Sequence, residues 1–436
     1  MGESQSHPKD RRYERWRWQV FAITWLAYAG FYLTRLSFSV AKIEMGKDSG
    51  TGLGLSNEWM GWIDGAYLTA YAVGQFFWGI CGDRHGTRKV ILASMLCSVV
   101  AALAMGASSM PILLMALLGI QGLCQAGGWA PLTKNVSYFF SQRERGTVMG
   151  LWCTNYALGG FVASVYAGYF GDLWGWRYAF YVPAATLLVI WLLFIWLQRN
   201  KPEDAGLPPI EEYHGEGEAV LLTDEMPAEE REGSWKVILE VCTNPMVLLL
   251  AAVYFFIKPA RYAILFWAPK YLNERLGTNM LESGAISGLF QLAGPISVLA
   301  GGVLSDKLFG SKRNPVSIIC LFLLAGALFV LDTLPADRLM LGGCFFLIGF
   351  FLFAPDSLIS GTAAIDFGTK KGASTAAGLI NGCGSVGAIV GGTLPGLLHD
   401  RLGWNGLFQI LAASALIAGC LLAPKWNATP AKVSRR

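Results

Sequence analysis

The segment from Gly79 to Lys89 has the sequence GICGDRHGTRK, and the segment from Gly301 to Arg313 has the sequence GGVLSDKLFGSKR. Each follows an apolar run long enough to cross a bilayer as a helix, which takes about 20 residues. A second pair recurs in the same order: GYFGDLWGWRYAF begins at Gly168, and GLLHDRLGWNGLF begins at Gly396. Two matching pairs at a similar spacing indicate that one structural unit is used twice.

Apolar runs of membrane-spanning length recur along the whole chain. The sequence is 54% hydrophobic and only 15% charged, which exceeds the apolar content of a typical soluble domain. The alternating pattern of an outer-membrane barrel is absent, and the 52 glycines suit close packing of helices. We therefore predict an all-α membrane protein with twelve transmembrane helices in two pseudo-symmetric six-helix bundles. The predicted spans cover residues 18–41, 59–81, 90–109, 112–133, 147–170, 178–198, 246–268, 283–304, 315–332, 339–361, 373–395 and 405–423.

The same patterns divide the chain into segments. The two bundles are predicted over 18–198 and 241–423. Between them, residues 199–240 are acidic and rich in Glu, Pro and Gly, which predicts a flexible linker. A basic tail over 1–17 precedes the first bundle, and a short tail over 424–436 follows the second.

The basic residues indicate how the chain is oriented. Most of the 34 Lys and Arg lie in the tails and in loops on one face of the predicted bundle. Since cytoplasmic loops are enriched in Lys and Arg, both termini are predicted to be cytoplasmic. The plasma membrane, or the inner membrane of a Gram-negative bacterium, is the expected location. The basic residues are spread over many short loops, so no nucleic-acid partner is expected.

The sequence contains no residue pattern typical of an enzyme active site. The nine cysteines lie mostly within apolar runs and form no metal-binding pattern. No nucleophile–base arrangement and no phosphate-binding glycine loop is present. We therefore expect no enzyme, with no catalytic residues, no metal and no cofactor. The four histidines lie in tails or loops, so proton coupling would depend on Asp64 or Asp356.

Three basic side chains lie well inside the apolar runs: Arg35, Lys258 and Arg261. A cation at the centre of a span costs about 2.5–3.5 kcal/mol, so these residues indicate a function. Arg35 and Arg261 are separated by the repeat spacing, which places them at equal depth on the two bundles, facing a shared cavity. Guanidinium groups bind phosphate bidentately. A small anion is predicted as the ligand, and a phosphate monoester or inorganic phosphate fits best.

Two alternatives remain open for these cations: structural ion pairs with Asp64 or Asp356, or a Lys258 side chain that reaches to the membrane surface.

Helical spacing also predicts polar residues that line the same cavity. Asn155 and Asn381 serve helix packing in an alternative interpretation. The predicted lining consists of Tyr28, Tyr32, Tyr71, Gln75, Asn155, Tyr156 and Asn381.

Charged residues at the ends of the predicted helices suit a gating role. Asp83, Arg84, Arg88 and Asp306 lie in the repeated inner loops and are predicted to form latches between the bundles. Their alternative role is to set the topology by their charge alone. Asp64 in the second span either lines the cavity or acts in gating, and the sequence leaves this open.

The two segments with buried arginines, GFYLTRLSFSVAK around Arg35 and RYAILFWAPKYL from Arg261, resemble the organophosphate:phosphate antiporter family. This family belongs to the major facilitator superfamily, whose pattern of six helices, linker and six helices the chain also resembles. The resemblance implies a monomer with a substrate site at mid-membrane between two bundles that rock around it. It implies that Arg35 and Arg261 bind the phosphoryl group, with Lys258 assisting.

The sequence also departs from the family pattern. Leu36 replaces a lysine that usually follows the first arginine, Gln75 replaces a lysine in the second helix, and Tyr156 replaces a histidine in the fifth. These differences predict a substrate that is less charged than glycerol 3-phosphate, or differently oriented.

The function expected from the residues and the resemblance is exchange of a phosphorylated metabolite, such as a sugar phosphate, glycerol phosphate or phosphoglycerate, for inorganic phosphate. An importer of another organic anion, such as a carboxylate or phosphonate, driven by protons or sodium, is one alternative. A membrane sensor of sugar phosphate that transports little is another.

Overall fold

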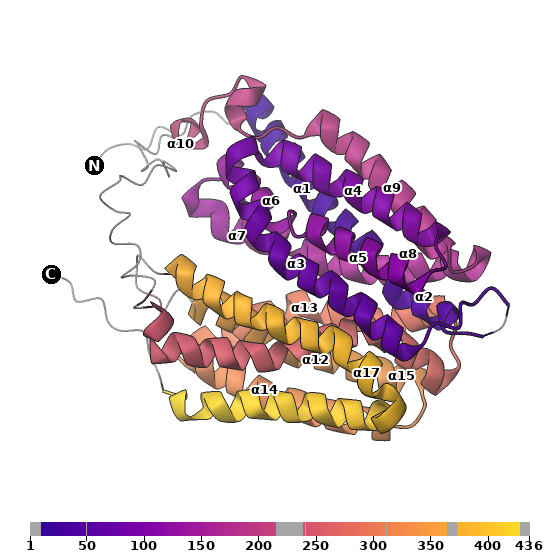
Figure 1. The fold of residues 1–436 in the computed structure, drawn as a ribbon. Coiled ribbons are helices and arrows are strands. Elements are labelled where there is room, and N and C mark those ends of the chain that lie inside the picture. Colours follow the sequence, from indigo (N-terminus) through magenta and orange to yellow (C-terminus); the bar gives the residue numbers. More distant parts are fainter. Residues whose placement is uncertain are drawn as a thin grey trace.

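The computed structural model describes residues 10–48, 50–214, 239, 241–310, 312–363 and 373–427. Figure 1 shows two groups of helices side by side, the first coloured indigo to magenta and the second orange to yellow. We call residues 10–214 the N-half and residues 241–427 the C-half.

The N-half contains α1 (Arg11–Arg35), α2 (Ser37–Met45), α3 (Asn57–His85), α4 (Thr87–Ala107), α5 (Pro111–Gln125), α6 (Trp129–Phe139), α7 (Gln142–Trp152), α8 (Thr154–Trp174), α9 (Tyr178–Leu197), η1 (Pro202–Ala205) and α10 (Ile210–Tyr213). The C-half contains α12 (Pro245–Leu276), α13 (Met280–Leu308), α14 (Arg313–Val330), η2 (Leu331–Thr333), α15 (Arg338–Ser357), η3 (Leu358–Ala363), α17 (Ala373–Leu422) and η4 (Ala423–Lys425).

The helices coincide with the predicted spans, and each of the twelve runs falls on one or more of them. Among the described residues, nine helices are long and apolar enough to cross a membrane. This set counts α17 once, although a break at Gly403, with φ of 62°, divides it in two, and it does not include α1 and α3. Large apolar side chains cover the outside, such as Trp196 and Leu339, which are 78% and 84% exposed. The chain is therefore a multi-pass membrane protein.

Each half has its own core of buried apolar side chains. The N-half core includes Phe31, Trp152 and Phe180, all fully buried, and the C-half core includes Leu250 and Phe345. Small residues let helices within a membrane approach closely. The first core also contains Phe266 and Trp267 of α12, so apolar packing continues across the boundary between the halves.

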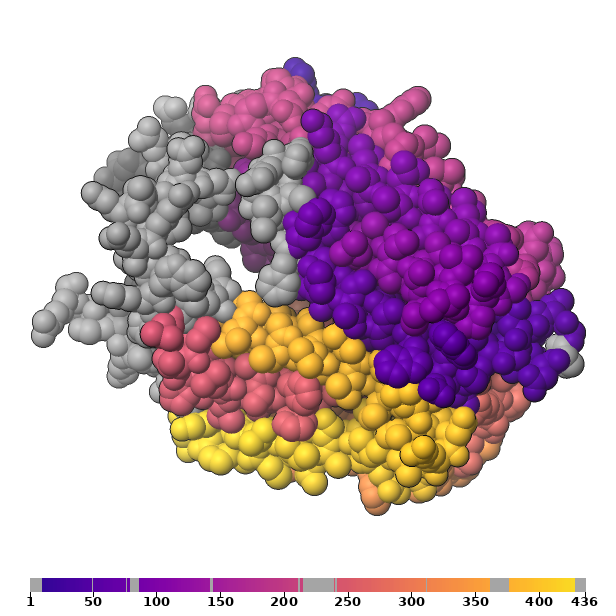
Figure 2. Space-filling model, viewed as in Figure 1, coloured from indigo at the N-terminus to yellow at the C-terminus, as the bar shows by residue number. Residues whose placement is uncertain are grey.

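The two halves meet along two helix pairs, α3 with α17 and α8 with α13. The first pair lies on the face shown in Figure 2. A Cβ atom added at Gly61 would lie 2.7 Å from the carbonyl oxygen of Thr393 and 3.0 Å from Cα of Gly396. Only glycine fits at such a close approach. Nearby, Asn57 donates to Asp400 at 2.8 Å. These contacts lie at the end of the bundle opposite to the chain termini (Figure 1).

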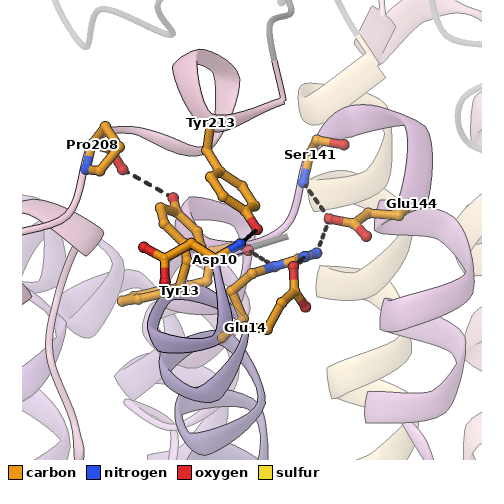
Figure 3. Close-up of polar contacts among 9 residues, drawn as sticks. Asp10, Tyr13, Glu14, Ser141, Glu144, Pro208 and Tyr213 are labelled. Atoms are coloured by element: carbon orange, nitrogen blue, oxygen red, sulfur yellow. Dashed lines mark hydrogen bonds and ion pairs between the residues drawn. The ribbon is translucent and has the colours of Figure 1, made fainter. Parts of the chain in front are cut away.

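The start of the linker is anchored to the N-half, as Figure 3 shows. The Tyr213 ring of α10 stacks on Tyr13 with 3.9 Å between ring centres, and the Tyr13 hydroxyl donates to the carbonyl of Pro208 at 2.9 Å. α1 begins at Arg11, before the predicted span, because the Asp10 side chain caps its first turn by accepting from Arg12 N–H. Residues 215–238 and 240 of the predicted flexible linker lie outside the described residues.

Candidate functional site

The first predicted cation, Arg35, lies where α1 stops. α1 ends at Arg35 and α2 begins at Ser37, and Leu36 between them has φ of −93° and ψ of −2°. The Leu36 N–H still donates to the carbonyl of Tyr32. The break places the guanidinium at a helix end deep inside the N-half, where Arg35 is only 7% exposed.

Arg35 is surrounded by aromatic rings and an amide. Its guanidinium carbon lies 4.4 Å from the ring centre of Tyr32 and 5.1 Å from that of Tyr71. Arg35 Nε donates to Gln125 Oε1 at 3.1 Å, and Tyr67 donates to the same oxygen at 3.0 Å. Within the described residues, Arg35 forms no ion pair and its Nη2 has no hydrogen-bond partner. A buried guanidinium with an unused donor can bind an anion.

The other two predicted cations lie on α12 and share one carboxylate. Lys258 Nζ lies 2.9 Å from Oδ1 of Asp356, and Arg261 Nη1 lies 2.6 Å from Oδ2. Asp356 comes from the last turn of α15 and is 7% exposed. The alternative interpretation, structural ion pairs with Asp356, therefore holds for the two cations of α12, whereas Arg35 takes no part in these pairs.

Glycines of α17 hold this part of α12 in place. A Cβ atom at Gly387 would lie 2.2 Å from the carbonyl oxygen of Phe255, and one at Gly391 would lie 2.4 Å from that of Pro259. Larger side chains cannot enter, so the two backbones touch. The contact fixes the turns of α12 that carry the two cations.

A pocket lies between the halves, among α3, α12 and α17. Four of the predicted residues line it: Tyr71 and Gln75 from α3, Lys258 from α12 and Asn381 from α17. Since Tyr71 also contacts the Arg35 guanidinium, the pocket adjoins basic groups of both halves.

A chain of aromatic rings connects Arg35 to Arg261 through the N-half. The ring of Tyr28 lies 5.9 Å from that of Tyr32 and 5.3 Å from that of Trp129. Trp129 lies 6.5 Å from Tyr156, and the Arg261 guanidinium carbon lies 5.9 Å from the Tyr156 ring. The predicted tyrosines thus surround the basic groups.

Two aromatic residues of this cluster were not predicted. Trp129 packs on Tyr28, and the ring centre of Phe353 lies 4.9 Å from the Arg261 guanidinium carbon. The signal that identifies them is the internal repeat, because Trp129-Ala130-Pro131 recurs as Phe353-Ala354-Pro355.

Asn155 remains a prediction. The residue is fully buried, and neither of its amide atoms has a hydrogen-bond partner among the described residues. An amide in this state suits a ligand with hydroxyl or phosphate oxygens.

The structure corrects one prediction: Arg35, Lys258 and Arg261 are not the only deeply buried cations. Lys42 of α2 is fully buried and forms an ion pair with Asp64 of α3. Its Nζ also donates across to the C-half, to the carbonyl of Phe266 at 3.1 Å, and lies 4.0 Å from the Trp267 ring centre. The sequence does not point to Lys42 because the first predicted span ends at residue 41, although a carboxylate such as Asp64, buried in a helix, needs a partner.

Lys42 and Ser39 both donate to the carbonyl of Phe266 on α12, and Ser39 also reaches the carbonyl of Leu265, four residues before Pro269. Pro269 has no N–H, so the carbonyl of Leu265 loses its helical partner. Ser39 Oγ donates to Leu265 O at 3.2 Å and to Phe266 O at 2.9 Å. Asp64, through Lys42, therefore supports the contact between the halves, which favours the gating interpretation for this residue.

Two of the other predicted gating residues, Asp306 and Arg88, make contacts inside one half. Arg313 Nη1 donates to Asp306 at 2.7 Å within the C-half, and the Arg88 guanidinium donates to the carbonyl of Ile195 within the N-half. The side chains of Asp83 and Arg84 lie outside the described part of the chain. A latch between the halves stays a prediction for these residues.

Known proteins resemble this chain both in sequence and in fold. The family model described as Major Facilitator Superfamily matches residues 20–389. The chain belongs to the major facilitator superfamily. A bacterial homologue of the human lysosomal transporter Spinster, solved in an inward-facing and unoccupied conformation, has the same fold, with a TM-score of 0.76 and 14% identity. The match covers 95% of this chain and 99% of that chain.

Several relatives in this superfamily are similar over nearly their whole length. A probable hexose phosphate transport protein of Chlamydia trachomatis is 32% identical, over 96% of this chain and 93% of that protein. The glycerol-3-phosphate transporter of Bacillus subtilis is 31% identical, over 96% of this chain and 94% of its own. A membrane sensor protein of Escherichia coli is 29% identical, over 96% and 94%. The resemblance to the organophosphate:phosphate antiporter family is thereby confirmed.

Proposed function

We propose that this chain exchanges a small phosphorylated metabolite for inorganic phosphate by alternating access. The observation that carries the proposal is the buried Arg35 guanidinium, which has an unused donor and no carboxylate partner among the described residues. A phosphoryl group placed between the halves would bind Arg35 on one side and Arg261 on the other. The relatives that transport hexose phosphate and glycerol 3-phosphate support the same ligand class.

The proposed setting is a monomer in the plasma membrane, or in the inner membrane of a Gram-negative bacterium, with both termini in the cytoplasm. Contacts between the halves gather at the end opposite to the termini, around Gly61 and Gly396. With that orientation, the described conformation is closed toward the outside.

The experiment that tests the function uses purified protein in vesicles loaded with inorganic phosphate. Uptake of radiolabelled phosphate is measured while a panel of sugar phosphates, glycerol phosphates and phosphoglycerates is added outside. Competition by one class of ester identifies the second substrate. Competition by carboxylates or phosphonates alone would instead support the importer of another anion.

A second candidate is a membrane sensor, favoured by the similarity to the sensor protein of Escherichia coli. An exchanger moves its substrate across the membrane, whereas a sensor binds the substrate and transports little of it. Tight binding of a sugar phosphate to the purified protein, together with no uptake into phosphate-loaded vesicles, is the result expected of a sensor.

Closure at the outer end predicts the effect of a larger residue at Gly61. In Gly61→Val, the side chain would meet the backbone of Thr393 and Gly396 at 2.7 and 3.0 Å. The halves can then no longer close at this end, so phosphate exchange falls by at least about tenfold while phosphate binding is retained.

The matched control is Gly302→Val, since an added Cβ at Gly302 meets nothing within 4 Å. Exchange and binding are compared in the same vesicles. Full exchange activity in Gly61→Val would show that this contact does not form in the transport cycle.

A further inference from the structure

The two half-sites differ in one respect that the internal repeat does not predict. Arg35 and Arg261 are equivalent by sequence, yet in the part of the chain that the structure describes Arg261 shares a carboxylate with Lys258 and Arg35 has none. Each oxygen of Asp356 faces one cation, at 2.9 Å from Lys258 Nζ and 2.6 Å from Arg261 Nη1. The corresponding position in the N-half repeat, after Pro131, is Leu132.

The Asp356 carboxylate occupies the donors that a phosphoryl group needs. A carboxylate and a phosphate present pairs of oxygens of similar geometry, and a guanidinium group binds either in the same way. Arg261 Nη1 and Lys258 Nζ cannot give their best hydrogen bonds to both anions at once. A phosphoryl group must therefore displace Asp356 or share its donors.

Asp356 also sets the charge of the site. The cations Arg35, Lys258 and Arg261 together with one carboxylate leave two net positive charges, which a dianionic phosphate neutralises. Without the carboxylate, three buried cations would face one another, with at most 16% of the Lys258 and Arg261 side chains exposed. Buried like charges repel strongly because the local dielectric constant is low.

We propose that Asp356 is an internal competitor of the substrate: it binds Lys258 and Arg261 in the empty site and yields them to the phosphoryl group. The proposal rests on the proposed function, since it assumes a phosphorylated ligand. Arg35 then receives the anion first, and Arg261 joins when Asp356 is displaced. Competition of this kind weakens binding and speeds release, which an exchanger needs in every cycle.

The test measures phosphate binding and phosphate exchange in Asp356→Asn. With the competitor removed, the Kd for inorganic phosphate is expected to fall by at least about tenfold, and the maximal exchange rate is expected to fall because release becomes slow. Glu282→Gln is the control, since Glu282 pairs with Arg338 on the exposed end of α13. It is expected to change neither quantity.

A double variant keeps the test decisive if Asp356→Asn is unstable. Lys258→Met combined with Asp356→Asn restores two net positive charges and is expected to bind phosphate within a few-fold of the wild type, whereas Lys258→Met alone binds more weakly. Unchanged or weaker binding in Asp356→Asn with the wild-type melting temperature overturns the proposal, as does loss of binding in the double variant. Absence of binding of any phosphorylated compound to the wild type would overturn the proposed function itself.

Discussion

Replacing Arg35 by glutamine is expected to abolish phosphate exchange, with a loss of at least about 100-fold. Two charge-assisted hydrogen bonds to a phosphoryl group contribute about 1.5–3 kcal/mol each, and 1.4 kcal/mol corresponds to a factor of ten. The variant also leaves the tyrosines and Gln125 without the cation that they surround. Exchange is measured in phosphate-loaded vesicles.

Two related variants show whether geometry or charge is required. Arg35→Lys keeps the charge but loses the planar fork, so we expect a loss nearly as large as for glutamine. Arg261→Gln is expected to lose less, about tenfold, because Lys258 remains in reach of the same ligand. Equal losses at Arg35 and Arg261, or full activity of Arg35→Gln, would contradict the site described here.

Lys42→Met is expected to destabilise the protein by about 3–5 kcal/mol, since it leaves the buried carboxylate of Asp64 without its partner. Asp64→Leu should destabilise the protein by a similar amount, because it leaves the buried ammonium group of Lys42 without its partner. The double variant, Lys42→Met with Asp64→Leu, is expected to recover most of the lost stability because it removes both charges. Unfolding midpoints in a detergent titration measure all three.

The double variant also distinguishes a structural pair from a pair that acts in transport. Lys42 donates to the carbonyl of Phe266 in the other half, so its removal weakens the closed outer end. Restored stability with a reduced exchange rate is the expected outcome for the double variant. If the stability losses of the two single variants simply add, Lys42 and Asp64 do not interact in the folded protein.

The internal repeat is the sequence feature that contributes most to the predicted site. Arg35, Lys258 and Arg261 were identified because charged residues in an apolar helix are rare, and the repeat placed the two arginines on opposite halves. The structure brings Tyr71, Gln75, Lys258 and Asn381 to one pocket. Helical periodicity was enough for this because the four residues lie on the long helices α3, α12 and α17.

The contacts that break the symmetry could not be predicted in the same way. The sequence offers Asp356 only as one of two alternative partners for these cations, because its pairing with the α12 cations depends on where the last turn of α15 lies. Lys42 lies beyond the break between α1 and α2 at Leu36. Neither position follows from helical spacing. The anchored start of the linker was also not predicted, because the stacking of Tyr213 on Tyr13 joins segments far apart in sequence.

The most direct test of the proposed exchange compares uptake of radiolabelled phosphate into vesicles that contain phosphate with uptake into vesicles that contain only buffer. The proposed mechanism predicts rapid uptake in the first case and little in the second, since the empty site with two net positive charges does not readily reorient. Equal uptake in both, or uptake that depends on a proton or sodium gradient and not on internal phosphate, would contradict it.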